Sequence, residues 1–325
     1  IIGLILGTIF KPGNGIDLSG VDPFTSGVAS MSVAERLFGI IPMNPFSSLA
    51  NGEVLPIIFF SILLGIGIIM GGDKTKSLGN FFSAAAEAVL KIAHMVMQVA
   101  PYGVLSLVAW VSGTMGLAAL QNLLVLTVIL YMGCLFHTIF VYGGLIRIFA
   151  KLPLKNFFRG ILDAQAVAYS TSSSSATLPV TLQCVQENLG VKKTVASSVL
   201  PLGATINMDG TALYLGIVAL FAAQIFGIDL SFTDYLLIAM TVTLTSIGTA
   251  GIPSASLFLL ATVLSVIGIS DEQTALIVGF VLPFDRILDM ARTAVNITGD
   301  ATVSVLVAKS ENEIDEDVFR ENAVL

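Results

Sequence analysis

The stretch "DRILDMARTAVNITGD", residues 285–300, carries five charged side chains between the apolar segments "LIVGFVLPF" and "VSVLVA". At about 3.6 residues per helical turn, its polar side chains fall within about 80° of one another. These side chains are Asp285, Asp289, Arg292, Asn296 and Asp300. The stretch therefore predicts a helix with one polar stripe, which other parts of the chain or a bound solute must compensate.

The composition around this stretch is that of a membrane protein. The chain has 325 residues, of which 55% are hydrophobic and 11% charged, whereas soluble domains carry about 25% charged residues. Residues 54–72, 92–146 and 235–270 contain no Asp, Glu, Lys or Arg, and about 18 apolar residues suffice to cross a bilayer. We predict an all-α polytopic protein of the lipid bilayer.

The first half of the chain is divided by its polar and proline-containing stretches. Residues 1–10 are interpreted as the end of a truncated transmembrane helix. The following elements are a polar loop, a short helix stopped by Pro42 and Pro45, a crossing helix, a long helical region interrupted at Pro101, and a second long span. The ranges are 11–33 for the loop, 34–46 for the short helix, 54–71 for the crossing helix, 78–113 for the interrupted region and 117–149 for the long span.

Basic residues suggest an orientation. Arg147, Lys151, Lys155 and Arg159 follow the long span, and cytoplasmic loops are enriched in Lys and Arg. We place this loop, residues 191–193 and Lys309 inside, with the acidic residues 310–325 as a solvated cytoplasmic tail.

Three polar stretches interrupt the apolar second half of the chain. They are "STSSSSATLP" (170–179), "GATINMDGTALY" (203–214) and "SIGTAGIPSAS" (246–256). Irregular backbone is tolerated in a membrane only where it is buried in protein or lines a wet cavity, and interrupted segments at corresponding places indicate a transporter site. We predict two re-entrant hairpins in an inverted repeat, at about 154–190 and 231–268, with a broken helix at 194–228 and a final helix at 273–308.

The residue types in these stretches indicate a site for a charged solute and cations. Arg292 can grip a carboxylate through its planar fork, and Asp289 can pair with an ammonium group, so the two favour an amino acid. A neutral side chain would leave the guanidinium unpaired, which favours aspartate or glutamate. Carbonyls at the "NMDG" break, with Asp209 and Asp300, suit an alkali cation, and the serines at 172–175 could cradle an anion at a helix start. A structural stripe and a plain kink are the alternatives.

Together these motifs resemble those of the dicarboxylate/amino acid:cation symporters, which include the excitatory amino acid transporters. The carrying residues are "SSSSATLPVT", "LPLGATINMDGTALY", "SIGTAGIPSAS" and "DRILDMARTAVNITGD". The resemblance implies a homotrimer of elevator-type protomers, in which a transport domain (114–309) slides against a scaffold (11–113) that forms the trimer. One departure is Ser172, which stands where some prokaryotic members of the family have Arg.

The resemblance assigns two groups of residues by motif match. The substrate would bind to Ser173, Ser174, Thr211, Ile252, Asp289, Arg292, Thr293 and Asn296. Sodium ions would bind to Gly203, Thr205, Asn207, Met208, Asp209, Ser246, Ile247, Thr249, Asn296 and Asp300. One ion would sit near Asp300, a second under the second hairpin, and a third at Asp209.

The expected function is sodium-coupled uptake of L-aspartate or L-glutamate across the cell membrane, without a cofactor or a nucleic-acid partner. The alternative is a sodium- or proton-coupled transporter of neutral amino acids or C4-dicarboxylates. An enzyme is disfavoured because "ITGD" lacks the Gly-x-Gly-Asp motif of intramembrane aspartyl proteases. A channel is disfavoured because two gate-like hairpins on opposite faces favour alternating access.

Overall fold

The computed structural model is helical throughout the ranges that it describes, which are residues 1–16, 41–51, 54–99 and 117–321 with a few positions between 102 and 113. In these ranges the only β-structure is an isolated bridge between Val191 and Ile314. Most of the predicted loop at 11–33, the start of the short helix before residue 41 and the predicted break at Pro101 lie outside the described residues.

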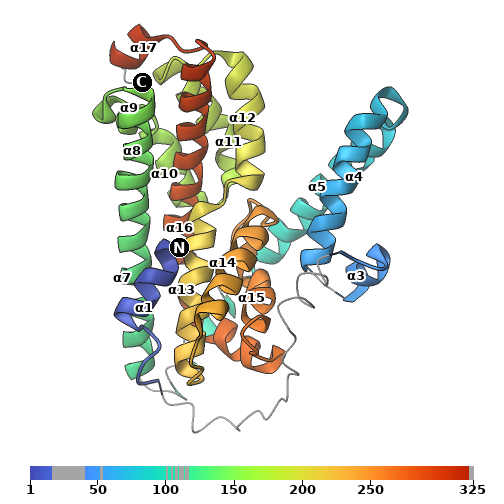
Figure 1. Ribbon diagram of the computed structural model, residues 1–325, viewed down its shortest axis with the longest axis vertical. Coiled ribbons are helices and arrows are strands. Elements are labelled where there is room, and N and C mark those ends of the chain that lie inside the picture. The colour runs from blue at the N-terminus through green and yellow to red at the C-terminus, as the bar shows by residue number, and fades with distance from the viewer. Residues whose placement is uncertain are drawn as a thin grey trace.

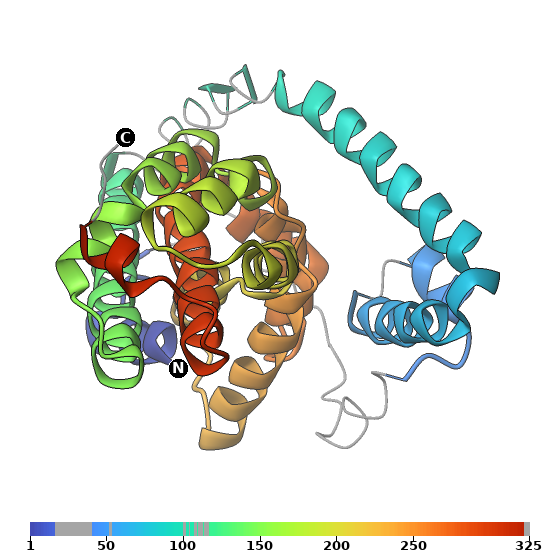
Figure 2. The ribbon, with the colours of Figure 1, turned by 90° about the horizontal axis from the view of Figure 1, so that it is seen from above.

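Three helices form an arm that projects from the rest of the molecule (Figures 1 and 2). They are α3 (Pro45–Asn51), α4 (Val54–Gly71) and α5 (Lys76–Met97). Pro45 begins α3, so the prediction that it ends a helix is wrong. The reason is local: Asn44 accepts from the amides of Phe46 and Ser47 as an N-cap, and proline is favoured in the first turn because its missing N–H has no helical partner.

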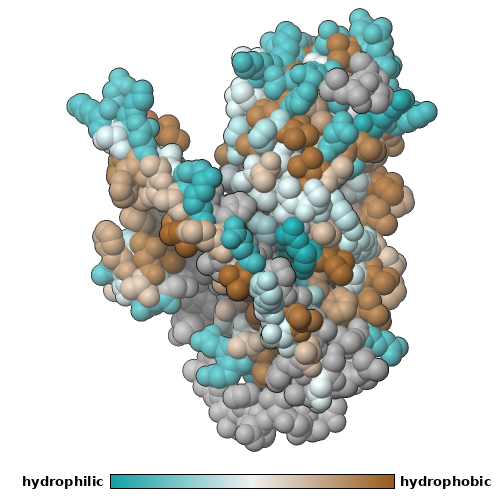
Figure 3. Space-filling model, turned by 180° about the vertical axis from the view of Figure 1, so that it is seen from behind, coloured by the Kyte–Doolittle hydropathy of each residue, from teal (hydrophilic) through white to brown (hydrophobic). Residues whose placement is uncertain are grey.

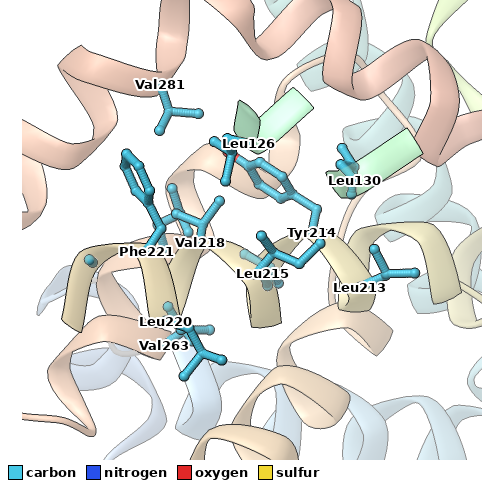
Figure 4. Close-up of a cluster of buried hydrophobic side chains, with 14 of the residues drawn as sticks. Leu126, Leu130, Leu213, Tyr214, Leu215, Val218, Leu220, Phe221, Val263 and Val281 are labelled. Atoms are coloured by element: carbon cyan, nitrogen blue, oxygen red, sulfur yellow. The ribbon is translucent and has the colours of Figure 1, made fainter. Parts of the chain in front are cut away.

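The body of the molecule is built around α13 (Asp209–Ile225), which α1 (Ile2–Phe10) and α7 (Leu117–Phe136) flank. Figure 4 shows the buried side chains of α13 packed with those of its neighbours, among them Leu126, Val263 and Val281. The helix that starts as α7 continues through π-helical turns at His137–Tyr142 and Ile146–Ala150. Apolar side chains on all sides of α13 thus bury the element whose N-terminus carries the "NMDG" motif.

The first helix–turn–helix comprises α9 (Leu154–Gly160), α10 (Leu162–Thr171) and α11 (Ser174–Gln183). The chain turns at Ser172, which has φ 54°, and Ser173 then caps α11 by accepting from the amide of Ala176 at 3.1 Å. The run of serines therefore ends one helix and begins the next, because short hydroxyl side chains satisfy the free N–H groups of a helix start.

The predicted helix break lies at Asn207 and Met208, between α12 (Lys193–Ile206) and α13. A second helix–turn–helix follows, with α14 (Phe232–Ile247) and α15 (Ala255–Ser265) joined through residues 248–254. The last long helix, α16 (Asp271–Ser310), runs without interruption past α10, α12 and α13. Three irregular stretches consequently meet the polar stripe of one continuous helix.

The described part of the acidic tail, residues 310–321, docks to the body through one buried side chain, whereas most of its charged side chains are exposed, as expected of a solvated end. Phe319, in α17 (Glu316–Glu321), is fully buried. Asn156 donates to the carbonyls of Phe319 and Arg320 at 3.1 and 2.7 Å, and Lys309 forms an ion pair with Glu316. Burial of the Phe319 ring stabilises the docked position of the tail although charged residues surround it, because aromatic side chains bury a large apolar area.

Three helical stretches in the described ranges are long and apolar enough to cross a membrane, namely Leu55–Lys74, Gln121–Ala150 and Lys193–Ile225. Figure 3 shows hydrophilic side chains at one end of the body and at the tip of the arm, further hydrophilic groups lower on the same face, and apolar side chains between them. The length and apolar composition of the three helical stretches fit a protein that spans a bilayer.

Candidate functional site

A small polar cavity lies where the two helix–turn–helix tips, the α12–α13 break and α16 meet. Six of the eight predicted substrate residues line its wall. They are Ser174, Thr211, Ile252, Asp289, Thr293 and Asn296. Its volume of about 10 Å³ is roughly the space that one water molecule needs, so the tips are closed over it.

The two tips are joined directly by hydrogen bonds. The Ser173 hydroxyl donates to the Gly251 carbonyl at 2.6 Å, and the Ser175 amide donates to the same carbonyl at 3.2 Å. Ser173, a predicted substrate residue, thus lies behind the cavity wall and holds the second tip against the first.

Arg292 also lies behind the wall rather than on it. Its fully buried guanidinium pairs with Asp285 at 3.0 Å and with Asp289 at 2.9 Å. Its Nη1 donates to the Ser256 hydroxyl at 2.6 Å, and the group lies 4.0 Å from the centre of the Tyr214 ring. The positive charge therefore reaches the cavity only through Asp289 and Ser256.

The sequence analysis named Asp289 beside Arg292, but it did not predict that Asp285, Ser256 and Tyr214 contact the guanidinium. Asp285 precedes Arg292 by two helical turns, and its place on the polar stripe could have indicated a second counter-ion. Ser256 and Tyr214 reach Arg292 from α15 and α13, and no spacing within α16 predicts contacts with other helices.

The first predicted sodium site is assembled from three elements. Asn207 at the break donates to the buried Asp300 carboxylate at 2.9 Å and to the Asn296 carbonyl at 3.2 Å. Gly203 lies so close that a Cβ there would be 2.5 Å from an Asp300 oxygen. Carboxylate, amide and backbone oxygens are hard ligands that fit an alkali cation. Asn296 also accepts from the Gly210 amide at 2.8 Å and donates to the Met208 sulfur.

The residues of the second predicted sodium site lie near the end of α14. Ser246 and Thr249 are buried there and Ile247 is half-buried, whereas Thr205 is exposed on α12 and donates to the Leu202 carbonyl at 2.9 Å. Thr249 also lines the polar cavity. That these four residues hold one ion stays a prediction.

Asp209, the third predicted cation ligand, begins α13 and faces a larger cavity of about 350 Å³ beside α1 and α14. Tyr142 donates to its carboxylate at 2.6 Å, and His137 Nε2 lies 3.5 Å away. Sequence reasoning missed both partners because residues five apart lie about 140° apart on an α-helix. The π-helical turn of His137–Tyr142 brings them onto one side.

These acidic groups are distributed singly among amides and hydroxyls. The described residues contain no group of three or more His, Cys, Asp or Glu side chains that could hold one metal ion. The predicted cation ligands around Asp300 are carboxylate, amide and backbone oxygens, which are the donor type that alkali cations prefer.

Comparison with known proteins places this geometry in a family. The family model described as "Sodium:dicarboxylate symporter family" matches residues 1–310. The chain belongs to this family. It is 34% identical over 325 residues to the proton/sodium-glutamate symport protein of Geobacillus stearothermophilus, covering 98% of this chain and 76% of the relative.

Two other relatives show that the family handles more than one substrate. The proton/glutamate-aspartate symporter of Escherichia coli is 36% identical over 326 residues, which cover 97% of this chain and 73% of the relative. The C4-dicarboxylate transport protein of Bacillus subtilis is 35% identical over 323 residues, which cover 97% and 75%. This symporter-family chain is a membrane transporter and not an enzyme, which removes the intramembrane-protease alternative.

Proposed function

We propose that the chain carries an acidic amino acid, L-aspartate or L-glutamate, into the cell together with Na⁺. The observation that supports this most is Asp289, whose carboxylate lies on the cavity wall while its counter-ion Arg292 is buried behind it. A substrate ammonium group finds an acceptor in Asp289. A substrate carboxylate finds the positive end of the same ion pair, because opposite charges one helical turn apart complement a molecule that carries both.

Sodium coupling is supported by the surroundings of Asp300. Its buried carboxylate receives a hydrogen bond from Asn207, and no Lys or Arg forms an ion pair with it among the described residues. A buried charge in a membrane needs compensation. One Na⁺ held by Asp300, Asn207 and the carbonyls of Gly203 and Asn296 would supply it. A second ion near Thr249 and a third at Asp209 complete the proposal.

The closed cavity requires a moving part. The second tip is held to the first by bonds to one residue, Gly251, so opening of residues 246–256 would admit the substrate. The two helix–turn–helix units would enter the membrane from opposite faces, with the C-terminus inside the cell. The body would then slide as a transport domain against the arm, whose exposed apolar helices α4 and α5 would form a trimeric scaffold.

A C4-dicarboxylate is the second candidate, favoured by the similarity to the C4-dicarboxylate transport protein of Bacillus subtilis. Such a substrate has no ammonium group from which Asp289 could accept a hydrogen bond. Its second carboxylate would face the Asp289 carboxylate directly, and like charges at that distance repel. An acidic amino acid is therefore the better match to this wall.

The test is calorimetric titration of the full chain in detergent with L-aspartate, L-glutamate and succinate, each in Na⁺ and in K⁺. We expect the two amino acids to bind in Na⁺ only. Equal aspartate affinity in K⁺ would contradict sodium coupling. Binding of succinate without binding of either amino acid would contradict the role of Asp289 and favour the dicarboxylate candidate.

A further inference from the structure

We infer that Ser256 is a specificity-determining residue, whose hydroxyl presents the charge of Arg292 to the distal carboxylate of the substrate. This inference rests on the proposed acidic substrate and names the group that selects it. Arg292 is the only cationic side chain that is fully buried in the described ranges, yet it does not line the cavity. Ser256 does line it.

The position of Ser256 makes it a bridge between the second tip and the final helix. It lies in the first turn of α15, is 3% exposed, and its oxygen is 2.6 Å from Arg292 Nη1. A guanidinium has five N–H donors and no acceptor. Arg292 must therefore be the donor in this bond and the Ser256 oxygen the acceptor.

The proton of the Ser256 hydroxyl is consequently free for another partner. In the part of the chain that the structure describes, this hydroxyl donates to no protein acceptor, whereas two hydroxyls at the end of α14 and just after it donate to carbonyls four residues earlier. Thr245 donates to Thr241 at 2.5 Å, and Thr249 donates to Thr245 at 3.2 Å. Two hydroxyls of the second tip line the cavity, those of Thr249 and Ser256, and in the described ranges only that of Ser256 keeps its donor available to the cavity.

A buried donor without an acceptor favours a ligand that supplies one. The guanidinium polarises the hydroxyl, since a hydrogen-bonded chain strengthens each of its members. An anionic acceptor gains most, because charge-assisted hydrogen bonds are about twice as strong as neutral ones. A carboxylate on the substrate side chain would therefore bind more tightly here than the amide of the same shape.

The experiment compares L-aspartate with L-asparagine on three variants of the full chain. Ser256→Ala removes the donor, Ser256→Thr keeps it, and Ser265→Ala is the matched control, an exposed serine of α15 whose hydroxyl donates to Thr262. Affinities are measured by displacement of radiolabelled aspartate in Na⁺, with fluorescence-detected thermal unfolding to compare folding.

We expect Ser256→Ala to weaken L-aspartate about 10- to 100-fold, the size of one hydrogen bond to a charged group. L-asparagine should change less than about threefold, and Ser256→Thr and Ser265→Ala should stay near the unaltered chain. A purely structural role would weaken both ligands equally and would overturn the inference. So would a Ser256→Ala variant that matches the control.

The same variants separate this inference from the proposed function. If the unaltered chain binds succinate and neither acidic amino acid, the proposed function fails, and the comparison is repeated with succinate. Ser256→Ala must then weaken succinate by the same factor, or the inference fails as well. If the chain binds none of these acids, both are wrong.

Discussion

Removal of Arg292 should destabilise the fold far more than removal of its partner Asp285. Arg292, Asp285 and Asp289 form one cluster with contacts of 2.9 and 3.0 Å, and their side chains are 0%, 1% and 10% exposed. The cluster has two carboxylates and one guanidinium. Arg292→Gln would leave two buried carboxylates without a cation, whereas Asp285→Asn would leave a neutral ion pair.

The magnitudes follow from this difference in charge. Loss of one partner of a buried ion pair costs about 3–5 kcal/mol, which we expect for Arg292→Gln. In Asp285→Asn, the amide oxygen can still accept from Arg292 Nη2, so we expect a cost near that of one weakened hydrogen bond, about 1 kcal/mol. The double variant should recover part of the Arg292→Gln loss, because residues in contact show coupling energies of about 0.5–3 kcal/mol.

The assay is fluorescence-detected thermal unfolding of the three variants without substrate, in one detergent. We expect a decrease of roughly 5–15 °C for Arg292→Gln and a few degrees for Asp285→Asn. The double variant should unfold between them and should not bind aspartate, because the guanidinium is gone. Equal decreases for the two single variants would refute the reasoning, as would a double variant no more stable than Arg292→Gln.

Three further substitutions test other parts of the structure. Gly203→Ala places a Cβ 2.5 Å from an Asp300 oxygen, so aspartate binding should need about tenfold more Na⁺, whereas Gly279→Ala, with open space around it, should leave the Na⁺ titration unchanged. Gly210→Ala presses a Cβ against the backbone of Arg292. Its free energy of unfolding should fall by the cost of an overpacked contact, about 1–3 kcal/mol or more, which a lower unfolding temperature would report. Phe319→Ala removes a fully buried ring worth about 3–5 kcal/mol, so amides of residues 313–320 should lose hydrogen-exchange protection while aspartate binding persists.

The parts of the fold that could be predicted are those that local sequence determines. The polar stripe of 285–300 lies on one continuous helix because its residues recur with the helical period. The break at Asn207 and the turn at Ser172 occur where short polar side chains compete with the helix for backbone hydrogen bonds. Each of these features depends on residues within a few positions of one another.

The parts that could not be predicted depend on contacts between distant segments. Ser256 meets Arg292 across two helices, and nothing in either segment alone indicates the pair. The π-helical turn that brings His137 to Asp209 follows no apolar period. At the tail, the acidic composition indicated exposed charged residues but not that Phe319 among them would be buried against the body.

The charges of the site give a reason for coupling transport to cations. The side chains of Asp285, Asp289 and Asp300 are buried, Asp209 is half-buried, and Arg292 is the one buried guanidinium in the described ranges. Four carboxylates and one guanidinium leave a formal charge of −3, and an acidic amino acid adds one further negative charge. Moving such a charge through hydrocarbon is costly. Under the proposed function, cation binding at Asp300 and Asp209 would offset this negative charge when the loaded body moves, and we expect the cation-free form not to carry the substrate.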